Sequence, residues 1–205
     1  MGDRYLYVAR HAEATEDGTG LTGRGRRQGV LLGRRLRDVP LSVITHGPLP
    51  RAAQTAEAVR GELDGVPAML AEEAGDYVPH IPAAEDLPEE FRELFVPWLA
   101  KFSAAEVEHG DTLVKAAMER FTGPVEGDEP RHELLVTHAW LAAWLVRAAT
   151  DAPAWRWLGL HPGNAALTVI RYSRYRPASL RVYNDMTHLP EDLRWTGFPA
   201  ELQSV

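Results

Sequence analysis

The sequence of 205 residues contains no cysteine and no long apolar run. The lack of cysteine excludes thiol nucleophiles, cysteine-ligated zinc or iron–sulfur sites, and disulfide bonds. No stretch approaches the ~20 apolar residues of a membrane span. The amino terminus lacks the apolar core of a signal peptide, and Leu6 stands where a myristoylation signal requires Ser or Thr. We therefore expect a soluble, cytoplasmic protein that does not bind membranes.

Positive charge is also scarce. The chain has 22 Lys and Arg residues against 29 Asp and Glu residues, which gives a formal net charge of −7. This balance argues against nucleic-acid binding through a wide basic face, but it leaves room for a small positive pocket. Apolar and charged contents of 45% and 25% are those of an ordinary globular protein. The length suits one domain over residues 1–205.

Short apolar runs alternate with longer amphipathic stretches along the chain. This alternation predicts an α/β layered fold with a mostly parallel central sheet. Thr22 is expected to cap the first helix and Asp111 a later one, while residues 64–88 read mostly as loop because of their four prolines. The expected strands are 5–9, 41–45, 134–137, 167–172 and 179–183, and the expected helices are 22–38, 51–63, 89–108, 111–121 and 140–150.

Three of the expected strands end in similar polar residues. Arg10 and His11 follow the first strand, Thr45 and His46 close the second, and His138 follows the third. In open α/β sheets the carboxyl ends of the strands line the ligand crevice. These residues, although far apart in sequence, are therefore expected to meet in space.

Their side chains suit phosphoryl chemistry. Arg10 and Arg51 can each clamp two phosphoryl oxygens through a rigid guanidinium fork. A neutral imidazole is a competent nucleophile, and two nearby guanidinium groups would keep His11 neutral at pH 7. His138, at the start of a helix, would add a donor together with free backbone N–H groups.

Four segments in order along the chain resemble the sequence boxes of the histidine phosphatase superfamily, the phosphoglycerate mutase-like proteins. The similarity is greatest to the small bacterial phosphatases of that family. The segments are residues 10–15 (RHAEAT, similar to RHGET), 21–28 (similar to LTxxGxxQ), 47–56 (similar to SPLxRAxQTA) and 136–139 (similar to VTHG). The resemblance implies a three-layer α/β/α sandwich.

The resemblance also implies roles for individual residues. His11 would be phosphorylated during turnover, while Arg10, Arg51 and His138 would bind the phosphoryl oxygens. A carboxylic acid would protonate the leaving oxygen and later activate water. Glu72 is the favoured acid, with Glu73 and Asp76 as alternatives, because this loop is one residue shorter than the family pattern.

Other positions match or depart from the family in ways that bear on the pocket. Ala12 and Ala139 replace glycines, Gly47 replaces a serine, and a segment around residues 72–110 is expected to form part of the substrate pocket. Either alanine would be strained if its position required a positive φ. Five residues are expected in or behind the pocket: Thr15, Gln28, His46, Asn164 and His188.

The sequence therefore predicts a phosphomonoester phosphatase that forms a phosphohistidine and acts on a small phosphorylated metabolite. No metal or other cofactor is implied, because the arginines supply the positive charge. Two alternatives are a phosphoglycerate mutase-type phosphoryl transfer and a non-catalytic phospholigand-binding protein on the same fold. The sequence carries no signal for an oligomeric state.

Overall fold

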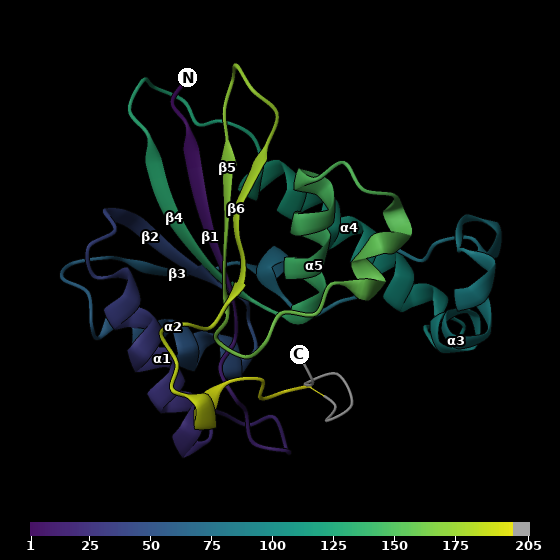
Figure 1. Ribbon diagram of the computed structural model, residues 1–205, viewed down its shortest axis with the longest axis horizontal. Coiled ribbons are helices and arrows are strands. Elements are labelled where there is room, and N and C mark those ends of the chain that lie inside the picture. Colours follow the sequence, from purple (N-terminus) through teal and green to yellow (C-terminus); the bar gives the residue numbers. More distant parts are fainter. Residues whose placement is uncertain (199–205) are drawn as a thin grey trace.

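Six strands form one mixed sheet at the centre of the computed structural model, which describes residues 1–198 (Figure 1). The strand order is β3-β2-β4-β1-β5-β6. Neighbouring strands are parallel from β3 to β1, whereas β5 runs antiparallel to both β1 and β6. The sheet is therefore mostly parallel, as expected. The strands are β1 (Arg4–Arg10), β2 (Leu41–His46), β3 (Ala68–Leu70), β4 (Arg131–Thr137), β5 (Leu167–Tyr172) and β6 (Ser179–Asp185).

Helices cover both faces of the sheet, which confirms the α/β/α sandwich. α1 (Gly23–Leu36) and α2 (Pro50–Arg60) pack on one face, and α4 (Ala104–Phe121) and α5 (Ala139–Ala149) pack on the other (Figure 1). Thr22 caps α1 as expected, because its side chain accepts a hydrogen bond from the backbone N–H of Gly25.

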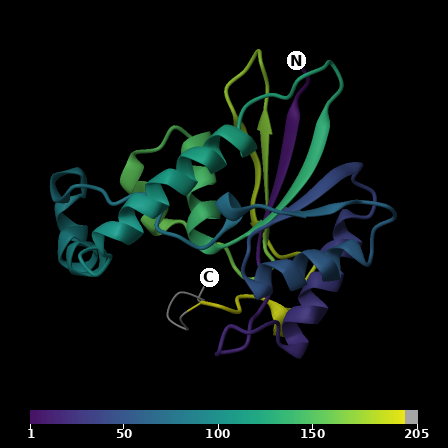
Figure 2. The same ribbon diagram turned by 180° about the vertical axis from the view of Figure 1, so that it is seen from behind.

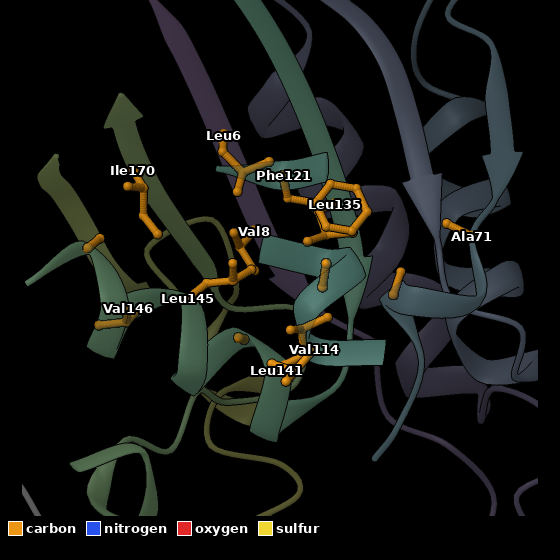
Figure 3. Close-up of a cluster of buried hydrophobic side chains, with 14 of the residues drawn as sticks. Leu6, Val8, Ala71, Val114, Phe121, Leu135, Leu141, Leu145, Val146 and Ile170 are labelled. Carbon is orange, nitrogen blue, oxygen red and sulfur yellow. The ribbon is translucent and has the colours of Figure 1, made fainter. Parts of the chain in front are cut away.

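Side chains alternate between the two faces of the central strands, so each strand contributes to the hydrophobic cores on both sides of the sheet. Leu6 and Val8 of β1 face α4 and α5, where they join Leu135, Leu141 and other apolar side chains (Figure 3). Their neighbour Ala9 faces α1 and α2. Strands covered on both faces need apolar residues at every position, which explains the continuous apolar runs in the sequence. Each fully buried leucine contributes roughly 1.5–3 kcal/mol to this packing.

The segment between β3 and α4 begins against the core and then projects from the body of the molecule. It contains the 3₁₀ turns η1 (Glu72–Ala74) and η2 (Ala84–Asp86) and the helix α3 (Glu89–Leu99), which stands apart from the sheet in both views (Figures 1 and 2). Two further 3₁₀ segments are η3 (Ala154–Gly159), which follows α5, and η4 (Glu191–Leu193), which follows β6. None of the helices in residues 1–198 is long and apolar enough to cross a membrane.

The expected helix boundaries in this region were wrong. Instead of helices over 89–108 and 111–121, the chain breaks after α3 and restarts at Ser103, which forms a reciprocal capping box with Glu106. Asp111 is therefore inside α4, where it pairs with Lys115. Gly110 is also helical, and a side chain there would collide with the carbonyl group of Val78. Its glycine thus serves close packing and not a helix end.

Candidate active site

The carboxyl ends of the parallel strands bring five polar residues together. His11 follows β1, Arg51 lies in the first turn of α2, His138 is the N-cap of α5, and Asp76 follows η1. The imidazole rings of His11 and His138 are 5.0 Å apart between centroids. Arg51 links His11 to Asp76, because its Nε lies 3.2 Å from His11 Nε2 and its Nη2 lies 2.7 Å from Asp76 Oδ2. We call these residues and Arg10 the His11 cluster.

The partners of His11 determine its tautomer. Its Nδ1 lies 2.8 Å from the carbonyl oxygen of Ala12, which can only accept a hydrogen bond. Its Nε2 faces the guanidinium Nε of Arg51, which can only donate. The proton of the neutral ring is therefore on Nδ1, and the lone pair of Nε2 points into the cluster. This is the arrangement that a nucleophilic imidazole requires.

Both histidines are neutral at physiological pH. Burial, reinforced by the charge of Arg10, lowers the pKa of His11 to about 3. Burial and the charges of Arg51 and Arg10 lower the pKa of His138 to about 3. Neither ring nitrogen of His138 has a hydrogen-bond partner among residues 1–198, although the ring is only 1% exposed. An oxyanion bound in the cluster would satisfy such a buried polar group.

Arg10 forms the buried wall of the cluster. Its Nη1 donates to the carbonyl oxygen of Pro162 over 3.0 Å, and its Nε has no partner in the described part of the chain. Burial lowers the pKa of Arg10 to about 10, so the guanidinium is still charged at pH 7. Arg10 and Arg51 thus place two positive charges around neutral imidazoles, which is a suitable site for a dianion.

The structure brings Asp76 into the cluster and leaves the favoured acid, Glu72, outside it. Asp76 Oδ2 contacts Arg51 and lies 3.6 Å from His138 Nδ1. Glu72 is exposed at the start of η1, and within residues 1–198 its carboxylate has no hydrogen bond or ion pair with the cluster. Glu73 turns away to pair with Arg120 over 2.7 Å. The shortened loop therefore presents its third acidic residue to the site.

Several expected pocket residues support the cluster from behind. Asn164 donates to the backbone carbonyl of His11 over 3.1 Å. The next residue, Ala165, donates its N–H to the carbonyl of Arg10 over 3.0 Å, and its own carbonyl accepts from His188 over 3.1 Å. Gln28 accepts from the backbone N–H of Glu13 and is fully buried. These contacts hold the end of β1 in place without touching a ligand.

The side chains of two other expected residues form hydrogen bonds to residues nearby in the chain. The hydroxyl of Thr15 donates to Asp17 in the turn after β1. His46 Nδ1 donates to the carbonyl oxygen of Gly47, and within residues 1–198 its ring makes no hydrogen bond to the cluster. Among residues 1–198, neither side chain is hydrogen-bonded to the His11 cluster.

The replaced glycines and serine cause no strain. Neither Ala12 nor Ala139 has a positive φ, so an alanine fits both backbones. At Gly47, by contrast, a Cβ atom would lie 2.4 Å from the carbonyl oxygen of Ala74. That oxygen also accepts a hydrogen bond from the buried hydroxyl of Thr137. Glycine at this position thus permits the loop carrying Asp76 to pack against the end of β2.

Sequence reasoning missed the role of Thr55. Its fully buried hydroxyl accepts from the N–H of Ala12 over 2.9 Å and donates to the carbonyl of Arg51 over 2.6 Å. One hydroxyl thus links the backbones of the two segments that carry the imidazole and the guanidinium. Its presence in the segment resembling SPLxRAxQTA was the only available signal.

No metal-binding arrangement is found in the described chain. Within residues 1–198, no group of three or more His, Asp or Glu side chains is placed to hold a metal ion. The positive charge in the cluster comes from the guanidinium groups of Arg10 and Arg51.

Comparison with solved structures places the fold. The α-ribazole phosphatase from Shigella flexneri superimposes with a TM-score of 0.63 at 21% sequence identity, over 88% of this chain and 96% of that one. The phosphoserine phosphatase from Entamoeba histolytica, solved with 3-phosphoglyceric acid, gives a TM-score of 0.62 at 16% identity, over 91% and 100% of the two chains. At these identities the likeness concerns the fold.

Comparison of sequences gives the family. The mouse (Mus musculus) mitochondrial serine/threonine-protein phosphatase PGAM5 is 24% identical over 201 residues, which cover 92% of this chain. This chain spans only 65% of the length of that relative. Residues 6–185 match the histidine phosphatase superfamily (branch 1), a range that contains the whole His11 cluster. The chain belongs to the histidine phosphatase superfamily.

Proposed function

We propose that the protein is a phosphomonoester phosphatase that works through a phosphohistidine at His11 and acts on a small phosphorylated metabolite. The observation that carries the proposal is the unprotonated Nε2 of His11, aimed into a cluster with two guanidinium groups and an unpartnered imidazole. A phosphoryl dianion has three outer oxygens to place, and Arg10, Arg51 and His138 offer donors for them.

In the first step, the lone pair of His11 Nε2 attacks phosphorus and the ester P–O bond breaks. The imidazole becomes positively charged, and its Nδ1–H bond to the Ala12 carbonyl stabilises that charge. Since Nε2 carries no proton, no base is needed to activate it. Arg10 and Arg51 neutralise the charge that spreads over the outer oxygens.

The leaving oxygen needs a proton, and we assign its delivery to Asp76. When a phosphoryl dianion binds Arg51 in place of Asp76, the carboxylate of Asp76 loses its cationic partner and gains a negative neighbour. In this step the carboxylic acid form of Asp76 donates its proton to the leaving alcohol. His138 lies beside the carboxylate of Asp76 and orients the outer phosphoryl oxygens.

In the second step, water hydrolyses the phosphohistidine. Asp76, now a carboxylate, takes a proton from water while the water oxygen attacks phosphorus. The P–N bond breaks, inorganic phosphate leaves, and the electron pair returns to Nε2 of His11. The cycle thus restores the starting tautomer with no external cofactor.

The test is hydrolysis of p-nitrophenyl phosphate without added metal, with and without a chelator. His11→Ala should abolish turnover but retain phosphate or vanadate binding, since the arginines are still present. Rapid quenching with a radiolabelled phosphomonoester should place acid-labile, base-stable label on His11. Label found on serine or aspartate, or substantial activity in His11→Ala, would contradict the proposal.

Two other functions fit the same cluster and are separated by simple assays. A mutase would isomerise 3-phosphoglycerate in the presence of a catalytic amount of the 2,3-bisphosphate, whereas a phosphatase releases free phosphate. A binding protein would hold phosphate without any turnover that depends on His11. The complete set of reactive groups in the cluster favours an enzyme over a binding protein.

A further inference from the structure

A cavity of about 500 Å³ lies between α3 and the start of α5. Its lining is almost entirely apolar and aromatic: Leu94, Phe95, Trp98, Trp140, Trp157, Leu158 and His161. Trp157 and Leu158, only 2% and 3% exposed, form its floor, while Leu94 is 66% exposed at its rim. Cavities of roughly 300–1,000 Å³ hold small-molecule ligands in proteins, so this one has a suitable size.

The aromatic rings hold the cavity open as a fixed shape. Trp98 of α3 meets Trp140 and Phe102 edge-to-face, with centroid distances of 5.8 and 5.2 Å. Trp140 also meets Trp157 edge-to-face at 6.1 Å. Edge-to-face aromatic pairs are favourable and directional. The walls are therefore already formed before a ligand binds.

The cavity adjoins the His11 cluster through neighbouring residues of the chain. Trp140 follows His138 by two residues in the first turn of α5. On the other side, His161 precedes Pro162, whose carbonyl oxygen accepts the hydrogen bond from Arg10. The field of Arg10 reaches His161 and, after burial, is the second cause that lowers the pKa of that imidazole. A phosphate held by Arg10 and His138 would thus have its ester substituent at the mouth of this cavity.

The lining defines the chemistry of the substituent. Within residues 1–198, no Lys, Arg, Asp or Glu lines the cavity, so a charged or polyhydroxylated group would lose its hydration with few partners in return. The indole N–H of Trp157 is buried and has no acceptor among residues 1–198.

We propose that this cavity binds the leaving group of the substrate and selects phosphomonoesters of apolar alcohols or phenols with roughly five or more carbon atoms. The proposal rests on the phosphatase function above and adds the class of substrate. Leu94 and Trp98, on the projecting helix α3, are the specificity-determining residues. The volume of about 500 Å³ holds about 17 non-hydrogen atoms at the ~30 Å³ that a water molecule occupies in the liquid.

The test is kcat/KM for a homologous series of n-alkyl phosphates from ethyl to hexyl. Beyond ethyl, the leaving alcohols have nearly equal acidity, so the series varies apolar size and not the chemistry of the step. Each methylene that enters the cavity should raise kcat/KM roughly threefold to fourfold. Hexyl phosphate should therefore exceed ethyl phosphate by on the order of a hundredfold.

Leu94→Asn is the main variant, because a side chain that is mostly exposed can be replaced without loss of the core. It should lower kcat/KM for hexyl phosphate at least fivefold and leave ethyl phosphate within twofold. Val96→Asn is the matched control, since Val96 is also exposed on α3 but does not line the cavity. It should change neither substrate. Trp98→Ala should flatten the series as well, with circular dichroism to verify folding.

Each other outcome overturns the proposal in a recognisable way. Values of kcat/KM that stay within threefold from ethyl to hexyl, with His11-dependent hydrolysis intact, would refute the apolar subsite and leave the phosphatase function standing. Absence of hydrolysis for every ester would refute the phosphatase function itself. A flat series together with a dimer that Leu94→Asn dissociates, seen by analytical ultracentrifugation, would show that a second copy of the chain fills the cavity.

Discussion

Replacing His11 by glutamine should make the stability of the protein less sensitive to acid. In the folded protein, burial and then the charge of Arg10 lower the pKa of His11 to about 3, whereas an imidazole in the unfolded chain has a pKa of about 6.5. Below pH 6.5 the unfolded state therefore binds a proton that the native state does not. The free energy of unfolding falls as the pH drops from about 6.5 towards 3.

The size of the effect follows from these two values. Linkage gives about 1.36 kcal/mol per pH unit for one such group, so moving from pH 7.5 to pH 5 removes about 2 kcal/mol for His11. His138, whose pKa burial and the charges of Arg51 and Arg10 also lower to about 3, removes a similar amount. His11→Gln should therefore lose about 2 kcal/mol less than the wild type over the same range.

The assay is urea denaturation at several pH values between 5 and 7.5, in buffers without phosphate, because a bound anion would stabilise the native state. His109→Gln is the matched control. Its ring is exposed on α4 and is solvated in both the folded and the unfolded chain, so this variant should follow the wild type. Equal acid losses in the wild type and His11→Gln would refute the assignment of a buried, neutral His11.

Three further predictions concern the neighbours of His11. Asp76→Asn should lower kcat for alkyl phosphates by roughly 10²–10⁴-fold, and far less for p-nitrophenyl phosphate, whose leaving group departs without a proton. The control Glu72→Gln should leave both rates near those of the wild type. Equal losses on both substrates in Asp76→Asn would show that Asp76 is not the general acid. Thr55→Val strands the buried N–H of Ala12 and should cost about 1–3 kcal/mol in denaturant unfolding; an unchanged midpoint would contradict this. Gly47→Ala places a Cβ atom against the carbonyl oxygen of Ala74 and should lower the free energy of unfolding by about 1–3 kcal/mol, measured as a lower Tm. A Tm equal to that of the wild type would show that the loop carrying Asp76 can move without cost.

The loop between β3 and α4 shows where sequence reasoning stops. Three acidic residues within five positions were equivalent candidates, and counting from the family pattern favoured Glu72. Which one reaches the cluster depends on the 3₁₀ turn at η1, on the pull of Arg120 on Glu73, and on the fit of Gly47 against Ala74. The last two are contacts between segments distant in sequence, and a local pattern does not contain them.

The helix break after α3 has a similar cause. The sequence predicted one helix over 89–108 and a second one capped by Asp111, which follows Gly110. The capping box at Ser103 and the close approach of Val78 to Gly110 reversed that interpretation. The capping box is local and was readable, whereas the role of Gly110 became visible only once α4 was packed against the segment around Val78.

By itself, the sequence determined the layered fold and the histidines and arginines that meet at one edge of the sheet, because continuous apolar strands must be covered on both faces and the polar residues at their carboxyl ends must share that edge. The choice of tautomer at His11, the selection of Asp76 and the tryptophan-walled cavity beside the cluster were decided only by tertiary structure. Each depends on distances of a few ångströms between segments that lie tens of residues apart, and side-chain packing sets such distances.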